Sequence, residues 1–131
     1  MHISRPLRVL IVDDTPIVRA VVRRALATDA RFEVVGESAN GREAIEHTSE
    51  FLPDLVLLDL AMPEMDGLEA LPHILGAAPS ARVIVLSAFS PDQMAHRAIA
   101  AGALAYLEKN RLAKELVLGI VTVFDGLLLD A

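Results

Sequence analysis

Short apolar runs alternate along the chain with longer segments in which apolar residues recur at helical spacing. The run that ends at Asp59 has no polar alternation, which is typical of a strand buried on both faces of a parallel sheet. The expected strands are residues 7–12, 32–37, the run before Asp59, 82–86 and 103–107. The carboxyl edge of such a sheet is where ligands and chemistry collect, so a carboxylate that ends a strand predicts a functional group.

Helix-start signals follow each run. Thr15 and Pro16 suit an N-cap and a first helical residue, and Ser90-Pro91-Asp92-Gln93 combines a cap, a proline and a glutamine at the third helical position. Capping boxes begin at Asn40 and Asp66, the fourth helix should end before Gly102, and the fifth should begin at Arg111. Five strand–helix units predict an α/β fold, a doubly wound five-stranded parallel sheet with five helices on its two faces.

Two helices have distinctive apolar faces. In the first, the residues expected to face the sheet are Ile17, Val18, Val21, Val22, Ala25 and Leu26. In the fifth, Leu112, Leu116, Ile120 and Val123 are enough for the core, which leaves Val117, Leu118, Val121, Phe124 and Leu128 as a surplus. We expect this surplus to be covered either by a second copy of the chain or by a neighbouring domain, to which the residues after Asp125 would be the linker.

Composition narrows the function classes. The chain has 131 residues, 53% of them hydrophobic, no cysteine and a formal net charge of −6. This size suits a single domain, and the lack of cysteine excludes disulfides and thiolate metal sites. The negative charge argues against nonspecific binding of nucleic acid. With no signal peptide or membrane-length apolar run, we expect a cytoplasmic protein that does not enter membranes.

Chemistry-bearing side chains gather at the predicted carboxyl ends of the strands. They are Asp13 and Asp14 after the first strand, Asp59 after the third, Ser87 after the fourth and Lys109 after the fifth. Three converging carboxylates repel one another and imply a hard divalent cation, Mg²⁺ or Mn²⁺. A lysine and a hydroxyl at the same point can hold the oxygens of a phosphoryl group.

These residues occur in motifs that resemble the receiver domain of bacterial two-component response regulators. The motifs are Val12-Asp13-Asp14, Leu58-Asp59-Leu60-Ala61-Met62-Pro63 with Asp66-Gly67, Ser87-Ala88, and Gly102-Ala103-Leu104-Ala105-Tyr106-Leu107-Glu108-Lys109. The resemblance covers residues 1–131 as a single receiver domain. It implies a flavodoxin-like sheet with strand order 2-1-3-4-5, and phosphorelay signalling in which a histidine kinase or phosphotransfer protein is the partner.

By this resemblance, Asp59 is the phosphoacceptor. Asp14 and the backbone carbonyl of Ala61 would bind Mg²⁺ with it, and Asp13 would support the ion through water. Ser87 and Lys109 would contact phosphoryl oxygens. Tyr106 would turn inward when Ser87 moves, and so switch the surface of the fourth helix, fifth strand and fifth helix, through which a homodimer could form. The chain would be no enzyme beyond its own phosphorylation and dephosphorylation.

The sequence departs from the family pattern at two positions. Asn110 follows the lysine where the family usually has proline, and Ser87 stands where threonine is commoner. A cis bond before a non-proline residue costs about 3–4 kcal/mol, so the geometry of the Lys109–Asn110 peptide stays open.

Two alternatives were weighed against the main interpretation. A phosphohydrolase of the haloacid dehalogenase type needs a second aspartate two residues after its nucleophile, and those positions hold Thr15 and Ala61. The chain could also be the receiver fragment of a larger regulator with a DNA-binding or enzymatic output domain outside it. Nothing after residue 112 has room for a helix-turn-helix, so we expect no direct nucleic-acid binding by this domain.

Overall fold

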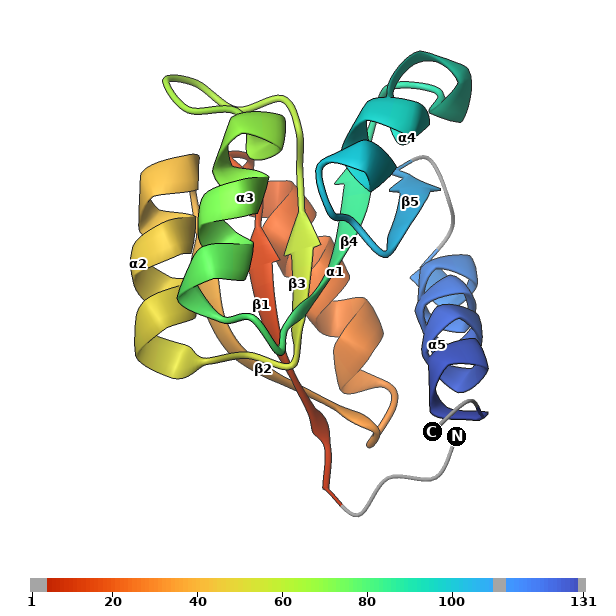
Figure 1. Ribbon diagram of the computed structural model, residues 1–131. Coiled ribbons are helices and arrows are strands. Elements are labelled where there is room, and N and C mark those ends of the chain that lie inside the picture. The colour runs from red at the N-terminus through yellow and green to blue at the C-terminus, as the bar shows by residue number, and fades with distance from the viewer. Residues whose placement is uncertain (1–4, 110–112, 130–131) are drawn as a thin grey trace.

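The fold is a five-stranded parallel sheet between two helical layers (Figure 1). The computed structural model describes residues 5–109 and 113–129, with the backbone alone for 113–114 and 124–129. Its elements are β1 (Leu7–Val12), α1 (Pro16–Ala27), β2 (Phe32–Ser38), α2 (Gly41–Phe51), β3 (Leu55–Leu58), α3 (Gly67–Ala77), β4 (Arg82–Ser87), α4 (Pro91–Ala100), β5 (Ala105–Glu108) and α5 (Ala113–Leu129). The strand order β2-β1-β3-β4-β5 confirms the predicted fold class.

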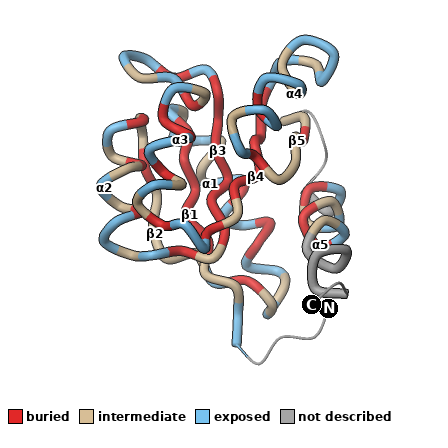
Figure 2. The backbone as a smooth tube through the Cα atoms, viewed as in Figure 1, coloured by how far each residue is buried: buried red, intermediate tan, exposed pale blue. Residues whose placement is uncertain are grey.

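Both faces of the central strands are buried, which explains why their sequences lack polar alternation (Figure 2). Successive side chains of a strand point to opposite faces. One face packs Val9, Ile11, Leu55 and Leu57 against α1 and α5, and the other packs Leu10, Val12, Val56 and Leu58 against α2, α3 and α4. Among the described residues, no helix is both long enough and apolar enough to cross a membrane.

The predicted starts of the first four helices are confirmed, with one difference in how a cap is made. The predicted start of the fifth, Arg111, lies outside the described residues. Asn40 and Asp66 each accept a hydrogen bond at 2.8 Å from the backbone N–H three residues on. Thr15 occupies the N-cap of α1, but its side chain makes no cap bond. Its backbone N–H donates instead to Asp13 Oδ1 at 2.9 Å, so the start of α1 is tied directly to the first acidic residue.

The predicted inner face of α1 is wrong for two residues. Ile17 is 70% exposed and Val21 is 54% exposed, whereas Val22, Ala25 and Leu26 are buried. A helix on a sheet buries one stripe, and here the stripe is narrower than the apolar pattern suggested. The two exposed residues line a cavity that Leu116 of α5 also lines.

The surplus assigned to α5 is also partly wrong. Val121 is 7% exposed and belongs to the core with Leu116 and Ile120, and Val117 packs against that core. Leu118 is 65% exposed, as predicted. The side chains of Leu112, Phe124 and Leu128 lie outside the described residues.

The last strand is shifted relative to the prediction. It runs from Ala105 to Glu108 because Ala103 and Leu104 belong to the turn that leaves α4. Leu104 N–H still reaches the sheet, donating to Val83 O at 2.8 Å. Gly102 has a φ of 114°, in the left-handed region that favours glycine, which is why the helix ends there.

Candidate functional site

The predicted site residues meet at the carboxyl edge of the sheet. Asp13 follows β1, Asp59 follows β3, and Ser87 ends β4. Carboxylate oxygens of Asp13, Asp14 and Asp59 all lie within 4.8 Å of one another. Asp13 and Asp59 are each only 2% exposed, whereas Asp14 is exposed to solvent. The cluster therefore has two buried acids and one that solvent reaches.

Lys109, which follows β5, completes this cluster. Its Nζ lies 2.6 Å from Asp13 Oδ2 and 3.1 Å from Asp59 Oδ1. Burial alone would lower the pKa of Lys109, but the hydrogen bonds to Asp13 and Asp59 outweigh it and hold the pKa above its ordinary value. The ammonium is therefore a fixed positive charge between the two buried carboxylates.

One ammonium does not fully compensate two buried carboxylates. Burial raises the pKa of Asp59, the charge of Asp13 raises it further, and the hydrogen bond from Lys109 only partly opposes both. Two carboxylates at this spacing favour any additional positive charge that can reach them. The donors are all oxygens and Asp14 is open to water, so the residues present fit a hard divalent cation such as Mg²⁺ or Mn²⁺.

Gly67 holds the backbone of Asp59 in place, a role that the sequence analysis missed. A Cβ on Gly67 would lie 2.0 Å from the carbonyl oxygen of Asp59, so only glycine fits. The Gly67 N–H donates to Leu60 O at 2.9 Å, which joins the first residue of α3 to the chain just after Asp59. The signal was present in the sequence, since a glycine directly after the Asp66 cap has no advantage for the helix itself.

The Ala61 peptide lies beside the same carboxylate. Its backbone N–H donates to Asp59 Oδ1 at 3.3 Å. The role predicted for its carbonyl oxygen, as a metal ligand, stays a prediction. The Lys109–Asn110 peptide lies outside the described residues.

Ser87 and Tyr106 are connected through the backbone of Phe89. Ser87, which is fully buried, accepts a hydrogen bond from the Phe89 N–H at 3.1 Å. The Tyr106 O–H donates to the Phe89 carbonyl oxygen at 2.7 Å. A displacement of the Ser87 hydroxyl can therefore reach β5 through the backbone of one residue, Phe89, although the predicted turning of Tyr106 stays a prediction.

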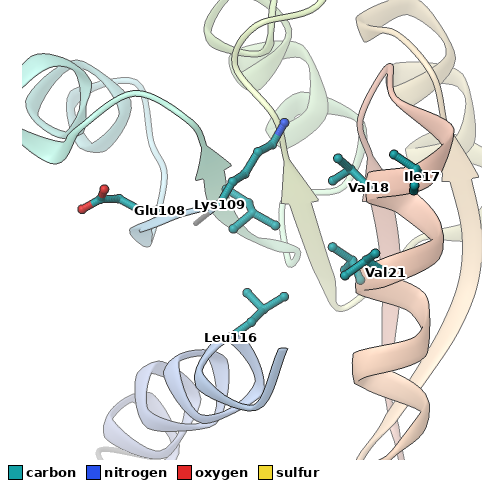
Figure 3. Close-up of a pocket in the computed structure, with 8 residues that line it drawn as sticks. Ile17, Val18, Val21, Glu108, Lys109 and Leu116 are labelled. Atoms are coloured by element: carbon teal, nitrogen blue, oxygen red, sulfur yellow. The ribbon is translucent and has the colours of Figure 1, made fainter. Parts of the chain in front are cut away.

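An apolar cavity of about 330 Å³ opens next to the acidic cluster. Figure 3 shows Val18 and Val21 of α1 facing Leu116 of α5 across it, with the side chain of Lys109 at one end. The described residues that line it are Ile17, Val18, Val21, Val22, Leu86, Glu108, Lys109 and Leu116. Exposed apolar residues of α1 thus lie beside the site rather than in the core.

The raised pKa of Asp59 gives a first prediction, for the protein without divalent cations. The fold disfavours the ionised form of Asp59. The protonated side chain therefore contributes stability below the ordinary aspartate pKa, and this contribution is lost as the pH rises through the raised pKa of the folded protein. Asp59→Asn should therefore raise the free energy of unfolding at pH 7, by on the order of 1 kcal/mol. The gain should shrink as the pH falls toward 4.

Urea denaturation in EDTA measures this effect, with Glu46→Gln, an exposed carboxylate of α2, as the control. An Asp59→Asn protein that is no more stable than wild type at pH 7 would contradict the proposed charge imbalance.

Comparison with known proteins identifies the family. The model of the response regulator receiver domain matches residues 9–120. The response regulator protein VraR of Staphylococcus aureus is 42% identical over 110 residues, which make up 84% of this chain and 53% of VraR. The chain thus spans about half the length of that relative.

Solved structures agree with this relationship. The receiver domain of the putative response regulator NarL from Mycobacterium tuberculosis superposes with a TM-score of 0.85 at 33% identity, over 93% of this chain and 98% of that one. CheY of Borrelia burgdorferi gives a TM-score of 0.85 at 29% identity, over 92% of this chain and 90% of that one. With its matching sheet and motifs, the chain belongs to the response regulator receiver domain family and serves two-component signalling.

Proposed function

We propose that the chain accepts a phosphoryl group from a histidine kinase or a phosphotransfer protein onto Asp59, with Mg²⁺ or Mn²⁺ bound. The observation that carries this proposal is the buried Asp59 carboxylate between two further acids and the Lys109 ammonium. The related CheY of Borrelia burgdorferi is described in a complex with BeF₃, Mg²⁺ and CheX, which supports the same chemistry here. Bound Mg²⁺ would supply positive charge for the phosphoryl oxygens.

The described contacts suggest how each residue takes part. An Asp59 oxygen attacks phosphorus as the P–N bond of the donor phosphohistidine breaks, and the electron pair leaves with the imidazole. Lys109 exchanges its hydrogen bond to Asp59 for one to a phosphoryl oxygen. Ser87 already accepts from Phe89 N–H, and its own O–H remains available to donate to another phosphoryl oxygen. Asp14, Asp59 and the Ala61 carbonyl would hold the metal ion, and Asp13 would support it through water.

On this proposal the chain promotes only its own phosphorylation and dephosphorylation. The phosphohydrolase alternative is disfavoured because no carboxylate stands at Thr15 or Ala61 to act as acid and base. Cytoplasmic location is part of the proposal, and the cysteine-free sequence fits a reducing compartment.

The phosphodonor would dock on α1. Ile17 and Val21 are exposed apolar residues, and they line the cavity that also contains Lys109. A partner that brings a phosphohistidine to Asp59 has to approach over this edge of the sheet. An apolar helix face on the partner would cover these two residues.

We also propose that phosphorylation switches the α4/β5/α5 surface through Ser87, Phe89 and Tyr106. Residues 1–131 would act as a single receiver domain. The alternative, a receiver portion of a larger regulator with a DNA-binding or enzymatic output domain, is supported by relatives about twice as long as the matched region. Asp59 would accept the phosphoryl group in the same way in a single receiver domain and in a larger regulator.

The direct test of the acceptor uses a small phosphodonor. Acetyl phosphate in Mg²⁺ should modify wild type at Asp59 and leave Asp59→Asn unmodified, because Asp13, the other described aspartate that contacts Lys109, has one oxygen bonded to Lys109 and the other to the Thr15 N–H. Intact-protein and peptide mass spectrometry locate the modification. Asp66→Asn, an exposed aspartate near the site, is the matched control and should be modified like wild type. Equal labelling of Asp59→Asn, or labelling that persists in EDTA, would sink the proposal.

A second prediction concerns the lifetime of the aspartyl phosphate, which should be long. Hydrolysis needs a water held in line with phosphorus, and the residues near its approach are Ala61 and Phe89, which line one cavity. Neither side chain can orient water. Ala61→Asn should shorten the lifetime severalfold, as followed by phosphate release, whereas Ala61→Val should not. A half-life of seconds for wild type would contradict this expectation.

A third prediction tests the proposed homodimer. Among the described side chains of α5, Leu118 is the large apolar one that is exposed to solvent, at 65%. Beryllofluoride should shift the protein toward a dimer in sedimentation velocity at tens of micromolar, and Leu118→Ser should reverse the shift. Val21→Ser on α1 is the control for a different apolar surface. A protein that is monomeric both with and without beryllofluoride would contradict the proposed dimer. Loss of the dimer in Val21→Ser, but not in Leu118→Ser, would place the dimer interface on α1.

A further inference from the structure

Asp13 is held by hydrogen bonds at every polar group. Its N–H donates to Ser38 O at 3.0 Å, and its carbonyl oxygen accepts from Arg19 Nη1 at 2.6 Å. Its side-chain oxygens accept from the Thr15 N–H at 2.9 Å and from Lys109 Nζ at 2.6 Å. Among the side chains in these contacts, Arg19 is not one of the residues predicted to bind the metal ion or the phosphoryl group.

Arg19 is aimed at this carbonyl by a second acid. Its Nε donates to Glu37 Oε1 at 3.0 Å, and its side chain is only 17% exposed. Burial would raise the pKa of Glu37, but the hydrogen bonds from Arg23 and Arg19 hold the pKa below its ordinary value. Glu37 is therefore charged at neutral pH. Because the guanidinium is planar and rigid, fixing Nε on Glu37 also fixes the direction in which Nη1 points.

The Asp13 carbonyl matters because it belongs to the peptide that begins Asp14. A peptide bond is planar, so holding the Asp13 oxygen fixes the plane from which the Asp14 side chain leaves. Asp14 is exposed, and its described side-chain contact is a long one, 3.5 Å from Thr15 Oγ1. The direction of its carboxylate thus depends on the backbone rather than on packing.

We propose that Arg19 is a positioning residue of the metal site, which aims Asp14 through the Asp13 carbonyl and is itself oriented by Glu37. This inference rests on the proposed function, since it assumes that Asp13, Asp14 and Asp59 hold a divalent cation. Outer groups that orient metal ligands contribute about 10–100-fold to metal affinity. The pair of Arg19 and Glu37 is thus part of the site and does more than hold α1 against β2.

The direction in which the Mg²⁺ affinity changes distinguishes a positioning role of Arg19 from a purely electrostatic effect of its charge. Arg19 is a cation close to a cation site, so removing its charge alone should strengthen Mg²⁺ binding. Loss of the positioning of Asp14 should instead weaken Mg²⁺ binding. Arg23 offers a matched control, because its Nε donates at 2.7 Å to the other oxygen of Glu37 and it makes no described contact with Asp13.

Isothermal titration with Mg²⁺ at pH 7 makes the comparison. Arg19→Met should weaken Mg²⁺ binding by about tenfold. Arg23→Met should bind as wild type does or slightly more tightly, and Arg19→Lys, which keeps one donor within reach of the carbonyl, should recover part of the loss. Beryllofluoride uptake by Arg19→Met should return to the wild-type level at saturating Mg²⁺. The free energy of unfolding is measured for every variant.

Equal Mg²⁺ affinities for Arg19→Met and Arg23→Met, or tighter binding by Arg19→Met, would overturn the inference. If Arg19→Met does not fold, Arg19→Gln against Arg23→Gln decides in the same way, because loss of the positive charge alone again predicts tighter Mg²⁺ binding and loss of positioning predicts weaker binding. A wild-type protein that does not bind Mg²⁺ would instead refute the proposed function itself.

Discussion

The burial of two carboxylates around one ammonium is the constraint on which the rest of the site depends. Asp13 and Asp59 share Lys109, and the pKa of Asp59 is raised because the ammonium does not offset both burial and the neighbouring charge. The site is therefore short of positive charge, and that shortage is a property of the fold. A site prepared in this way favours a divalent cation over an apolar ligand, because a buried charge is stabilised by a partner that brings opposite charge.

The topology of the sheet creates this constraint, and a few backbone contacts preserve it. Parallel strands deliver all their carboxyl ends to one edge, so acids that follow β1 and β3 and a lysine that follows β5 meet there without any long connection. Like charges in that position would push the loops apart. The loops are held instead by Gly67 against the Asp59 carbonyl and by Arg19 on the Asp13 carbonyl.

The sequence predicted those features that depend on the chain locally, and it failed where distant segments decide. Strand and helix starts follow from caps and apolar runs, so the fold and the convergence of Asp13, Asp59, Ser87 and Lys109 could be predicted. The exposure of Ile17 and the burial of Val121 depend on how closely α1 and α5 approach, which no local pattern encodes. The sequence did not single out Arg19, because its partner Glu37 lies on β2 and the distance between the two is set by the tertiary fold.

The hydrogen-bonded path from Ser87 to Tyr106, on which the proposed switch depends, is weak. Ser87 reaches Tyr106 through two hydrogen bonds, one to the N–H and one to the carbonyl oxygen of Phe89, and each contributes about 1 kcal/mol. Loss of one such bond shifts a two-state equilibrium by about fivefold and loss of both by about thirtyfold, which is a change of populations rather than a complete switch. A larger response has to come from contacts that a partner adds on α4, β5 and α5. On the proposed switch, the acidic site would therefore set the direction of the response, and contacts made on α4, β5 and α5 would set its extent.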